Sequence, residues 1–396
     1  MLNKIKNIDK QNFMNTFGDR LPVCFTEGKG MKLKATDNTE YYDFLGGIAV
    51  NSLGHSHPYF VIKLQEQVSK IIHTSNLYYI EPQSILAERL ISKTCMDKVF
   101  FSNSGAEANE GAIKLAKIYF YKKGIEKYEI ISLDHSFHGR TLATVAATGQ
   151  EKYQKPYKPL TPGFIQVEPN NIDAIKNAIT DKTAAILLEP IQGESGVHPM
   201  DKEYLKEIRK ICDEKDILLI FDEVQTGMGR CGELYAYQLF DVEPDILTSA
   251  KALGGGVPIG AILAKDFVAD AFSPGDHGST FGGNHLATAA GNAVLDIYEN
   301  EHLVENSKEM GLYFKEKLEA LKNVFKCIKE IRGEGLLIGI ELDEAIAKDV
   351  FNALFENKIL TSLCYTTVRL APPLIITKSD IDMFIDIFKK IIAERN

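Results

Sequence analysis

Short, continuous apolar runs alternate with helix-length segments through the middle of this chain. The runs lie at residues 99–101, 129–132, 184–188 and 217–221, and each one ends in a polar or glycine-containing turn. Apolar runs without polar alternation are typical of strands buried on both faces, as in a parallel sheet. Between them, the segments 107–120 and 201–214 have the length and apolar spacing of helices. This alternation predicts an α/β fold.

The two ends of the chain have a different pattern. Before residue 42, strand-length pieces are separated by turn sequences at 28–30 and 36–38. After about residue 285, helices flank a strand-like run at 335–342, and an apolar stripe behind Ser379 predicts a last helix with that serine as its N-cap. We therefore expect a large central domain, and a smaller domain that is assembled from both chain ends. The expected division is 1–55 (N-terminal part of the small domain), 56–285 (large domain) and 286–396 (C-terminal part of the small domain).

Charge, hydropathy and cysteine content disfavour several kinds of partner and indicate the compartment. The chain has 45 Lys and Arg against 54 Asp and Glu, a formal net charge of −9, which disfavours nucleic acid or an anionic membrane as the main partner. No apolar run approaches the ~20 residues that cross a bilayer, and the first twenty residues lack a signal-peptide core. The six cysteines are widely spaced, so we expect reduced thiols in a cytoplasmic protein, without a disulfide framework or a metal site.

An apolar run that ends in two carboxylates is the strongest local feature. Residues 217–225 read ILLIFDEVQ. The carboxyl ends of parallel strands open onto the ligand crevice, so we expect Asp222 to lie there. An acid that faces solvent at the end of a strand is the alternative, and a partner residue is needed to decide between them.

Lys251 supplies such a partner 29 positions later. It lies in the small-residue sequence SAKALGGG at 249–256. A lysine in a tight, apolar place would have a depressed pKa and could form a Schiff base with a carbonyl group. A surface lysine in a flexible loop is the alternative.

A third feature is a strand that runs through small residues into a helix, FSNSGAEAN at 101–109. Backbone N–H groups of Ser104, Gly105 and Ala106 would point from the helix N-terminus at an anion, for which phosphate is the natural choice. The same residues also fit an ordinary capping box of Ser104 and Glu107. The chain has neither a G-x-G-x-x-G sequence after this strand nor a G-x-x-x-x-G-K-[ST] sequence, which disfavours a dinucleotide or P-loop site.

Two of the eight arginines lie in sequences that suggest substrate binding. Arg140 lies in SFHGRT at 136–141, and Arg369 lies in VRLAPP at 368–373. A guanidinium group in a crevice can bind a carboxylate through two parallel hydrogen bonds. A structural ion pair is the alternative for each.

Four motifs occur together and in order: SNSGAEAN at 102–109, EPIQGE at 189–194, DEVQTG at 222–227 and SAKALGGG at 249–256. With these motifs the chain resembles the class III pyridoxal-phosphate aminotransferases over nearly its whole length. The resemblance implies the fold-type I architecture, in which a mixed, mostly parallel sheet lies between helices and a smaller α+β domain is attached. It also implies pyridoxal 5'-phosphate as the cofactor, and a homodimer with active sites at the interface.

The resemblance also implies roles for individual residues. Lys251 would hold the cofactor covalently and move protons, and Asp222 would pair with the ring nitrogen, so these two are the expected catalytic residues. The other expected cofactor contacts are Ser104, Gly105 and Ala106 on the phosphate, Phe137 on the ring face, Gln225 on the phenolic oxygen, and Thr280 on the phosphate in the neighbouring subunit. The expected substrate contacts are Arg140, Arg369, Ser279 and Glu194, the last as a gate that pairs with Arg369.

The sequence IAVNSLGH at 48–55 bears on the substrate. It resembles the branch of the family that acts on acetylornithine, because the ornithine branch has a tyrosine in place of Ile48. We therefore expect transfer of the δ-amino group of N2-acetylornithine to 2-oxoglutarate, a step of arginine biosynthesis. Succinylornithine, succinyldiaminopimelate, ornithine and γ-aminobutyrate stay open as donors, as does a non-catalytic regulator that binds pyridoxal phosphate.

Overall fold

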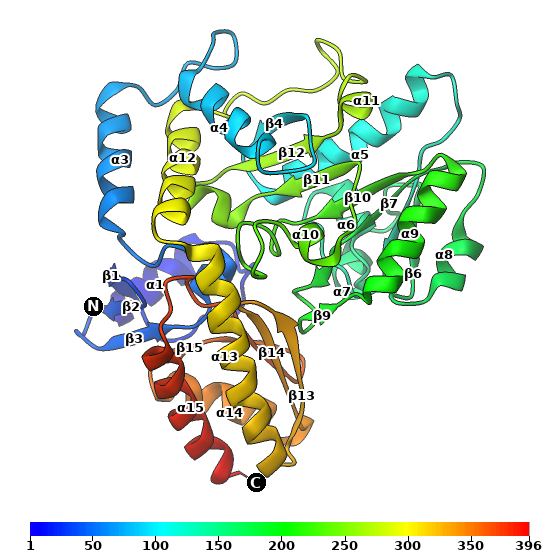
Figure 1. Ribbon diagram of the computed structural model, residues 1–396. Helices are drawn as coiled ribbons and strands as arrows, with labels where there is room; N and C mark the ends of the chain where they lie inside the picture. Colours follow the sequence, from blue (N-terminus) through cyan, green and yellow to red (C-terminus); the bar gives the residue numbers. More distant parts are fainter. Residues whose placement is uncertain (396) are drawn as a thin grey trace.

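A seven-stranded sheet forms the centre of the protein, whose computed structural model describes residues 1–395 (Figure 1). In spatial order its strands are β4 (Lys98–Ser102), β12 (Gly260–Ala264), β11 (Ile246–Ser249), β10 (Leu218–Asp222), β7 (Thr183–Leu188), β5 (Glu129–Leu133) and β6 (Phe164–Val167). Only β12 runs against its neighbours, and the remaining pairs are parallel. The expected mixed, mostly parallel sheet is confirmed.

Both faces of this sheet are covered, which explains the apolar runs in the sequence. Along β10, Leu218 and Ile220 pack into the core beneath helix α5 (Gly105–Lys122), whereas Leu219 and Phe221 pack into the opposite core. Helix α9 (Lys202–Lys215) contributes to that second core. A strand with apolar neighbours on both faces has no position for a polar side chain until it ends, so its first polar residue is Asp222.

The two ends of the chain meet in the smaller sheets. One sheet has the order β1 (Phe25–Lys29), β2 (Lys32–Ala35), β3 (Glu40–Asp43) and β15 (Ile359–Leu360), and the pair β3–β15 is parallel. The other has the order β13 (Ile328–Glu334), β14 (Leu337–Leu342), β17 (Thr367–Leu370) and β16 (Ser362–Cys364). Residues from both ends therefore share one sheet, while the domain boundaries remain a prediction.

Long helices connect and cover these layers. Helix α12 (His285–Asn300) packs on α3 (Pro58–Lys70) and α4 (Glu81–Ile91) and leads into α13 (Leu303–Val324), which crosses to the smaller sheets (Figure 1). Helices α14 (Glu344–Glu356) and α15 (Lys378–Ala393) complete this part. The remaining elements are α1 (Leu2–Asn12), α2 (Gly46–Ala49), α6 (Leu142–Ala147), α7 (Glu151–Gln154), α8 (Ile172–Ala178), α10 (Ala236–Phe240), α11 (Asp266–Ala269), the 3-10 helices η1 (Lys155–Tyr157) and η2 (Lys251–Gly254), and the strands β8 (Ile191–Gln192) and β9 (His198–Pro199). Over residues 1–395, no helix is long and apolar enough to cross a membrane.

Two features at the chain ends differ from the sequence expectations. Helix α1 was not expected from its sequence, in which the apolar residues Leu2, Ile5 and Ile8 are isolated among polar ones, and it buries none of its residues. Helix α15 begins one residue before Ser379, so the expected N-cap is wrong. Thr377 is the cap instead: its side chain accepts the N–H of Asp380, whose carboxylate accepts the N–H of Thr377. This reciprocal pair satisfies two N–H groups at once, which Ser379 cannot do.

Candidate active site

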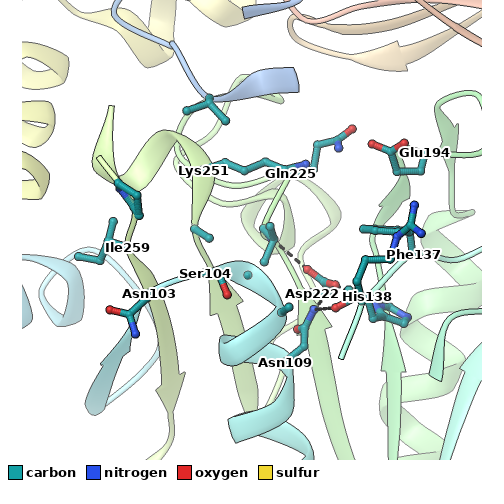
Figure 2. Close-up of a pocket in the computed structure, with 18 of the residues that line it drawn as sticks. Asn103, Ser104, Asn109, Phe137, His138, Glu194, Asp222, Gln225, Lys251 and Ile259 are labelled. Atoms are coloured by element: carbon teal, nitrogen blue, oxygen red, sulfur yellow. Dashed lines mark hydrogen bonds and ion pairs between the residues drawn. The ribbon is translucent and has the colours of Figure 1, made fainter. Parts of the chain in front are cut away.

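A cavity of about 440 Å³ lies at the carboxyl edge of the large sheet (Figure 2). Its walls come mainly from the segments that follow β4, β5, β7, β10 and β11, the strands that point to this edge. Nine of the residues expected from the sequence line it: Ser104, Gly105, Ala106, Phe137, Arg140, Glu194, Asp222, Gln225 and Lys251. Five separate loops therefore bring the motifs together.

Lys251 is held in an unusual backbone conformation at the start of η2. Its φ is +48°, in the left-handed region that side chains other than glycine rarely adopt. In Figure 2 the side chain extends toward Gln225. Burial lowers the pKa of this amine to about 8, and Nζ has no hydrogen bond among residues 1–395. A lysine with this pKa has a sizeable neutral, nucleophilic fraction near neutral pH.

Asp222 is fixed by a buried hydrogen-bond network and is only 3% exposed. Its Oδ2 accepts hydrogen bonds from Asn109 Nδ2 at 2.7 Å and from His138 Nδ1 at 2.8 Å (Figure 2). Its Oδ1 accepts the N–H of Val224 at 3.1 Å. Because donors surround both oxygens, the structure holds an oriented carboxylate at the cavity wall.

The neighbouring acid, Glu223, faces away from the cavity. Its carboxylate accepts the N–H groups of Ala236 and Tyr237 at the start of α10 and the hydroxyl of Thr226. Burial raises the pKa of Glu223 to about 7, although these hydrogen bonds oppose the shift. Of the two carboxylates at the end of β10, one belongs to the cavity and the other is structural.

Sequence reasoning missed the supporting roles of Asn109, His138 and Glu189. Asn109 is a polar residue on the buried face of α5, a signal that the sequence carried. Glu189 follows the apolar strand β7 as Asp222 follows β10, so the sequence carried a signal for it as well, whereas His138 lies in a loop without such a pattern. Glu189 accepts the N–H of Phe137 at 2.9 Å, and burial together with the charge of Asp222 raises its pKa well above the ordinary value.

The N-terminus of α5 opens onto the same cavity. Ser104 caps the helix by accepting the N–H of Glu107 at 3.2 Å, whereas the Glu107 carboxylate accepts the N–H of Asn103 rather than that of Ser104. The capping box, which was the alternative interpretation of these residues, is therefore only half formed. The helix itself does not use the N–H groups of Gly105 and Ala106. A Cβ on Gly105 would lie 2.6 Å from the Val224 side chain, so a residue larger than glycine would displace Val224 at this turn.

Arg369 and Glu194 form an ion pair beside Lys251. Arg369 is 3% exposed, and its Nη1 lies 2.9 Å from Glu194 Oε1 and 3.0 Å from the carbonyl oxygen of Gly193. Burial alone would raise the pKa of Glu194, but the charges of Arg369 and Lys251 hold it below the ordinary value. Glu194 is thus an ionised carboxylate that covers a guanidinium group.

The remaining expected site residues, two for the substrate and one for the cofactor of the neighbouring subunit, lie at the edge of the cavity or outside it. Arg140 is exposed, and its guanidinium carbon lies 3.9 Å from the centre of the Tyr153 ring. Ser279 does not line the cavity, but its hydroxyl accepts a hydrogen bond from the cavity residue Asn103 at 3.1 Å. Thr280 is exposed and does not line the cavity of its own chain.

These groups fit a phosphorylated, aromatic carbonyl cofactor. The helix N-terminus suits its phosphate, the unpartnered Lys251 amine suits its carbonyl, and Asp222 suits a protonated ring nitrogen. Within the described residues, no group of three or more His, Cys, Asp or Glu side chains is arranged to hold a metal ion.

Comparisons with known proteins identify the family. Residues 13–392 match the model of the aminotransferase class-III family. The chain is 50% identical to the acetylornithine aminotransferase of Methanocaldococcus jannaschii, with 98% of each chain covered. Its structure is similar to the acetylornithine aminotransferase of Elizabethkingia anophelis (36% identity, 99% of each chain covered, TM-score 0.88).

A third relative is the ornithine aminotransferase of Toxoplasma gondii, whose crystal structure contains pyridoxal phosphate at partial occupancy (33% identity, 100% of this chain and 96% of that chain covered, TM-score 0.94). The fold and the site thus define a class of enzyme that moves amino groups with this cofactor. The chain belongs to the class-III aminotransferases.

Proposed function

We propose that this chain transfers the δ-amino group of N2-acetylornithine to 2-oxoglutarate and forms N-acetylglutamate 5-semialdehyde and glutamate in arginine biosynthesis. Relatives named acetylornithine aminotransferase that match nearly the full chain at 46–50% identity support this proposal. The observation that best supports the proposed reaction is the Glu194–Arg369 ion pair, because this pair explains how a single cavity accepts a terminal amine and a 2-oxo acid in turn.

Pyridoxal 5'-phosphate is the proposed cofactor. Ser104, Gly105 and Ala106 would hold its phosphate, Phe137 and Gln225 its ring, and Asp222 its ring nitrogen. When bound, this cofactor supplies a carbonyl to which amines add and a ring that accepts electrons from the adjacent carbon. The carboxylate of Asp222 would keep that nitrogen protonated, because hydrogen bonds from Asn109, His138 and the N–H of Val224 fix its orientation.

Lys251 would move the protons of the reaction. Its amine is neutral in an appreciable fraction of molecules near pH 8, so Nζ can take a proton from the carbon that bears the reacting amino group. The resulting ammonium then returns a proton when the amino group has moved. No other lysine lines the cavity in the described part of the chain.

The two substrates require different carboxylate contacts. A donor that presents its terminal amine has its α-carboxylate far from the reacting end, where Arg140 lies at the cavity edge. A 2-oxo acid brings a carboxylate next to its reacting carbon, where Arg369 would bind it. Glu194 must leave Arg369 for that step, and it otherwise prevents a buried, unpaired guanidinium.

The surroundings of the donor favour an acylated α-nitrogen. Ile48 lies near the cavity residue Val50 with a φ of +65° and is 44% exposed. An aliphatic side chain offers no hydrogen bond to a free α-amino group, whereas it can pack against an acyl chain. This supports acetylornithine over ornithine as the donor.

We further propose a cytoplasmic homodimer with shared active sites. Leu77, Tyr78, Tyr79 and Phe281 are highly exposed. The side chain of Asn76 bonds the carbonyl oxygens of Ser279 and Gly282, so these apolar residues and Thr280 lie on neighbouring segments. An apolar patch of this kind is typical of a subunit interface. The six free cysteines fit a reducing compartment.

A donor panel tests the proposed function. Purified protein loaded with pyridoxal phosphate is given acetylornithine, succinylornithine, succinyldiaminopimelate, ornithine or γ-aminobutyrate, with 2-oxoglutarate as the acceptor. We expect the highest kcat/KM for acetylornithine. A higher kcat/KM for ornithine or γ-aminobutyrate would refute the assignment, and a visible cofactor band that persists unchanged with every donor, without turnover, would point to a binding protein.

A further inference from the structure

Glu194 lies on a short hairpin loop. Strands β8 (Ile191–Gln192) and β9 (His198–Pro199) pair in antiparallel fashion, and residues 193–197 connect them. We name residues 193–197 the gate loop. Glu194 can release Arg369 for one substrate and pair with it for the other either by a movement of this loop or, if the backbone keeps one position, by a movement of the side chain alone.

The gate loop lies across the sheet of β13, β14, β17 and β16, over a row of residues that lie opposite one another on adjacent strands. In that sheet Arg332 on β13 is opposite Gly339 on β14, and Gly339 is opposite Arg369 on β17. A Cβ on Gly339 would lie 2.8 Å from the carbonyl oxygen of Gly196. The glycine therefore leaves room for the loop to pass over the sheet between two arginines.

The two arginines hold opposite ends of the gate loop. Arg369 Nη1 donates to the carbonyl oxygen of Gly193 at 3.0 Å. Arg332 Nη2 donates to the carbonyl oxygen of Gly196 at 3.0 Å, and its Nε donates to that of Val197 at 3.2 Å. Only 8% of the Arg332 side chain is exposed, so water competes little for these hydrogen bonds.

Arg332 bonds to the backbone on both sides of Val197, the most strained residue of the loop. Val197 is fully buried and has a φ of +60°, a left-handed conformation that is unfavourable for a β-branched residue. Such a conformation persists only where the surroundings impose it. The carbonyl group of Gly196 precedes the Cα atom of Val197 and the carbonyl group of Val197 follows it. Arg332 donates hydrogen bonds to both carbonyl oxygens.

The side of the gate loop that faces away from the active site is not closely packed. Ser195, His198 and Arg332 border a second cavity of about 820 Å³ there. Ser195 Oγ is buried and has no hydrogen-bond partner in the described part of the chain. The loop thus has space to move away from Arg369, and the hydrogen bonds of Arg332 oppose that movement.

We propose that Arg332 is a positioning residue for the gate. Its hydrogen bonds clamp the backbone of residues 196–197, so that only the side chain of Glu194 moves when it releases or pairs with Arg369. The kinetic part of this inference rests on the proposed function. Arg332 also pairs with Glu330 and Glu341, which are partly exposed and remain hydrated when the arginine is removed.

Hydrogen exchange tests the clamp without any assay of activity. We compare the wild type with Arg332→Ala, Arg332→Lys and the control Glu341→Gln, which removes an ion-pair partner but no bond to the loop. Peptides that cover residues 193–197 should exchange about tenfold faster in Arg332→Ala, with and without pyridoxal phosphate. Arg332→Lys should lie between the two, and Glu341→Gln should match the wild type. Unchanged exchange in Arg332→Ala, or equal acceleration in Glu341→Gln, would overturn the proposal.

Single-turnover kinetics test the consequence for selectivity. The measured quantity is the ratio of the rate with acetylornithine to the rate with glutamate in the first half-reaction. Arg332→Ala should lower this ratio about tenfold, in the same direction as Glu194→Ala, and the double variant should equal Glu194→Ala alone. Equal losses with both donors, or additive effects, would contradict the clamp. If the wild type does not prefer acetylornithine, the proposed function fails while the exchange experiment still decides the role of Arg332.

Discussion

At the scale of single residues, Lys251 shows how placement creates reactivity. Its neighbours Ala250, Ala252 and Leu253 are buried, and its backbone lies in the left-handed region. The fold thus keeps an amine in an apolar wall at a cost in stability, which a protein tolerates at a functional site. The stability of the chain without cofactor should report this cost.

Lys251→Met should stabilise the cofactor-free chain at pH 7 by ~2 kcal/mol, after allowance for solvent screening of a partly accessible group. The folded pKa of about 8 lies below the ordinary 10.5, so between these values the unfolded chain binds the extra proton. Wild-type stability should therefore rise with pH across this window relative to the variant. Urea unfolding at pH 7, 8, 9 and 10 measures the difference. A difference that does not depend on pH would show that Lys251 is not destabilised by its charge.

Asp222 and Glu223 provide a matched pair of buried neighbours. Asp222→Ala should weaken the retention of pyridoxal phosphate by ~2–4 kcal/mol, the effect of removing one partner of a buried charged contact. Glu223→Gln should lower the stability of the protein through the start of α10, with cofactor affinity unchanged. Absorbance titration gives the affinity and thermal unfolding the stability. Equal cofactor affinities in the two variants would remove Asp222 from the cofactor site.

At the scale of elements, α15 offers a direct test of which residue caps the helix. Thr377→Ala removes the hydroxyl that accepts the N–H of Asp380 and should cost ~1 kcal/mol of unfolding free energy. Ser379→Ala should change stability by less than ~0.5 kcal/mol, because Ser379 lies inside the first turn. Denaturant unfolding of both variants decides between them, and the reverse order would restore Ser379 as the cap.

The elements also show what a sequence can predict here. Strands β7 and β10 follow from their apolar runs, because burial on both faces leaves no polar position. Helix α1 has no continuous apolar run, and none of its residues is fully buried. The motifs place Lys251 and Asp222 in one cavity, but the row formed by Arg332, Gly339 and Arg369 depends on strand register, which local pattern does not contain.

At the scale of the whole molecule, Thr280 should act across the subunit interface. It does not line the cavity of its own chain, and it lies beside the exposed apolar residues of the proposed interface. Lys251→Ala should abolish turnover, and Thr280→Ala should impair it. Heterodimers of the two variants would carry both lesions at one site and none at the other, so mixing should restore activity above either parent. No recovery after verified subunit exchange would mean that Thr280 serves its own chain.

Over the whole catalytic cycle, we propose that one cavity accepts two substrates because Glu194 pairs with Arg369 for the amino donor and releases it for 2-oxoglutarate. Single-turnover rates of the two half-reactions in Arg369→Ala test it most directly. We predict a loss of ~2–4 kcal/mol in the 2-oxoglutarate half-reaction, with the acetylornithine half-reaction comparatively spared. Glu194→Ala should instead speed the reaction of glutamate in the first half-reaction. Equal losses in both half-reactions of Arg369→Ala would contradict the exchange and leave Arg369 as a structural residue.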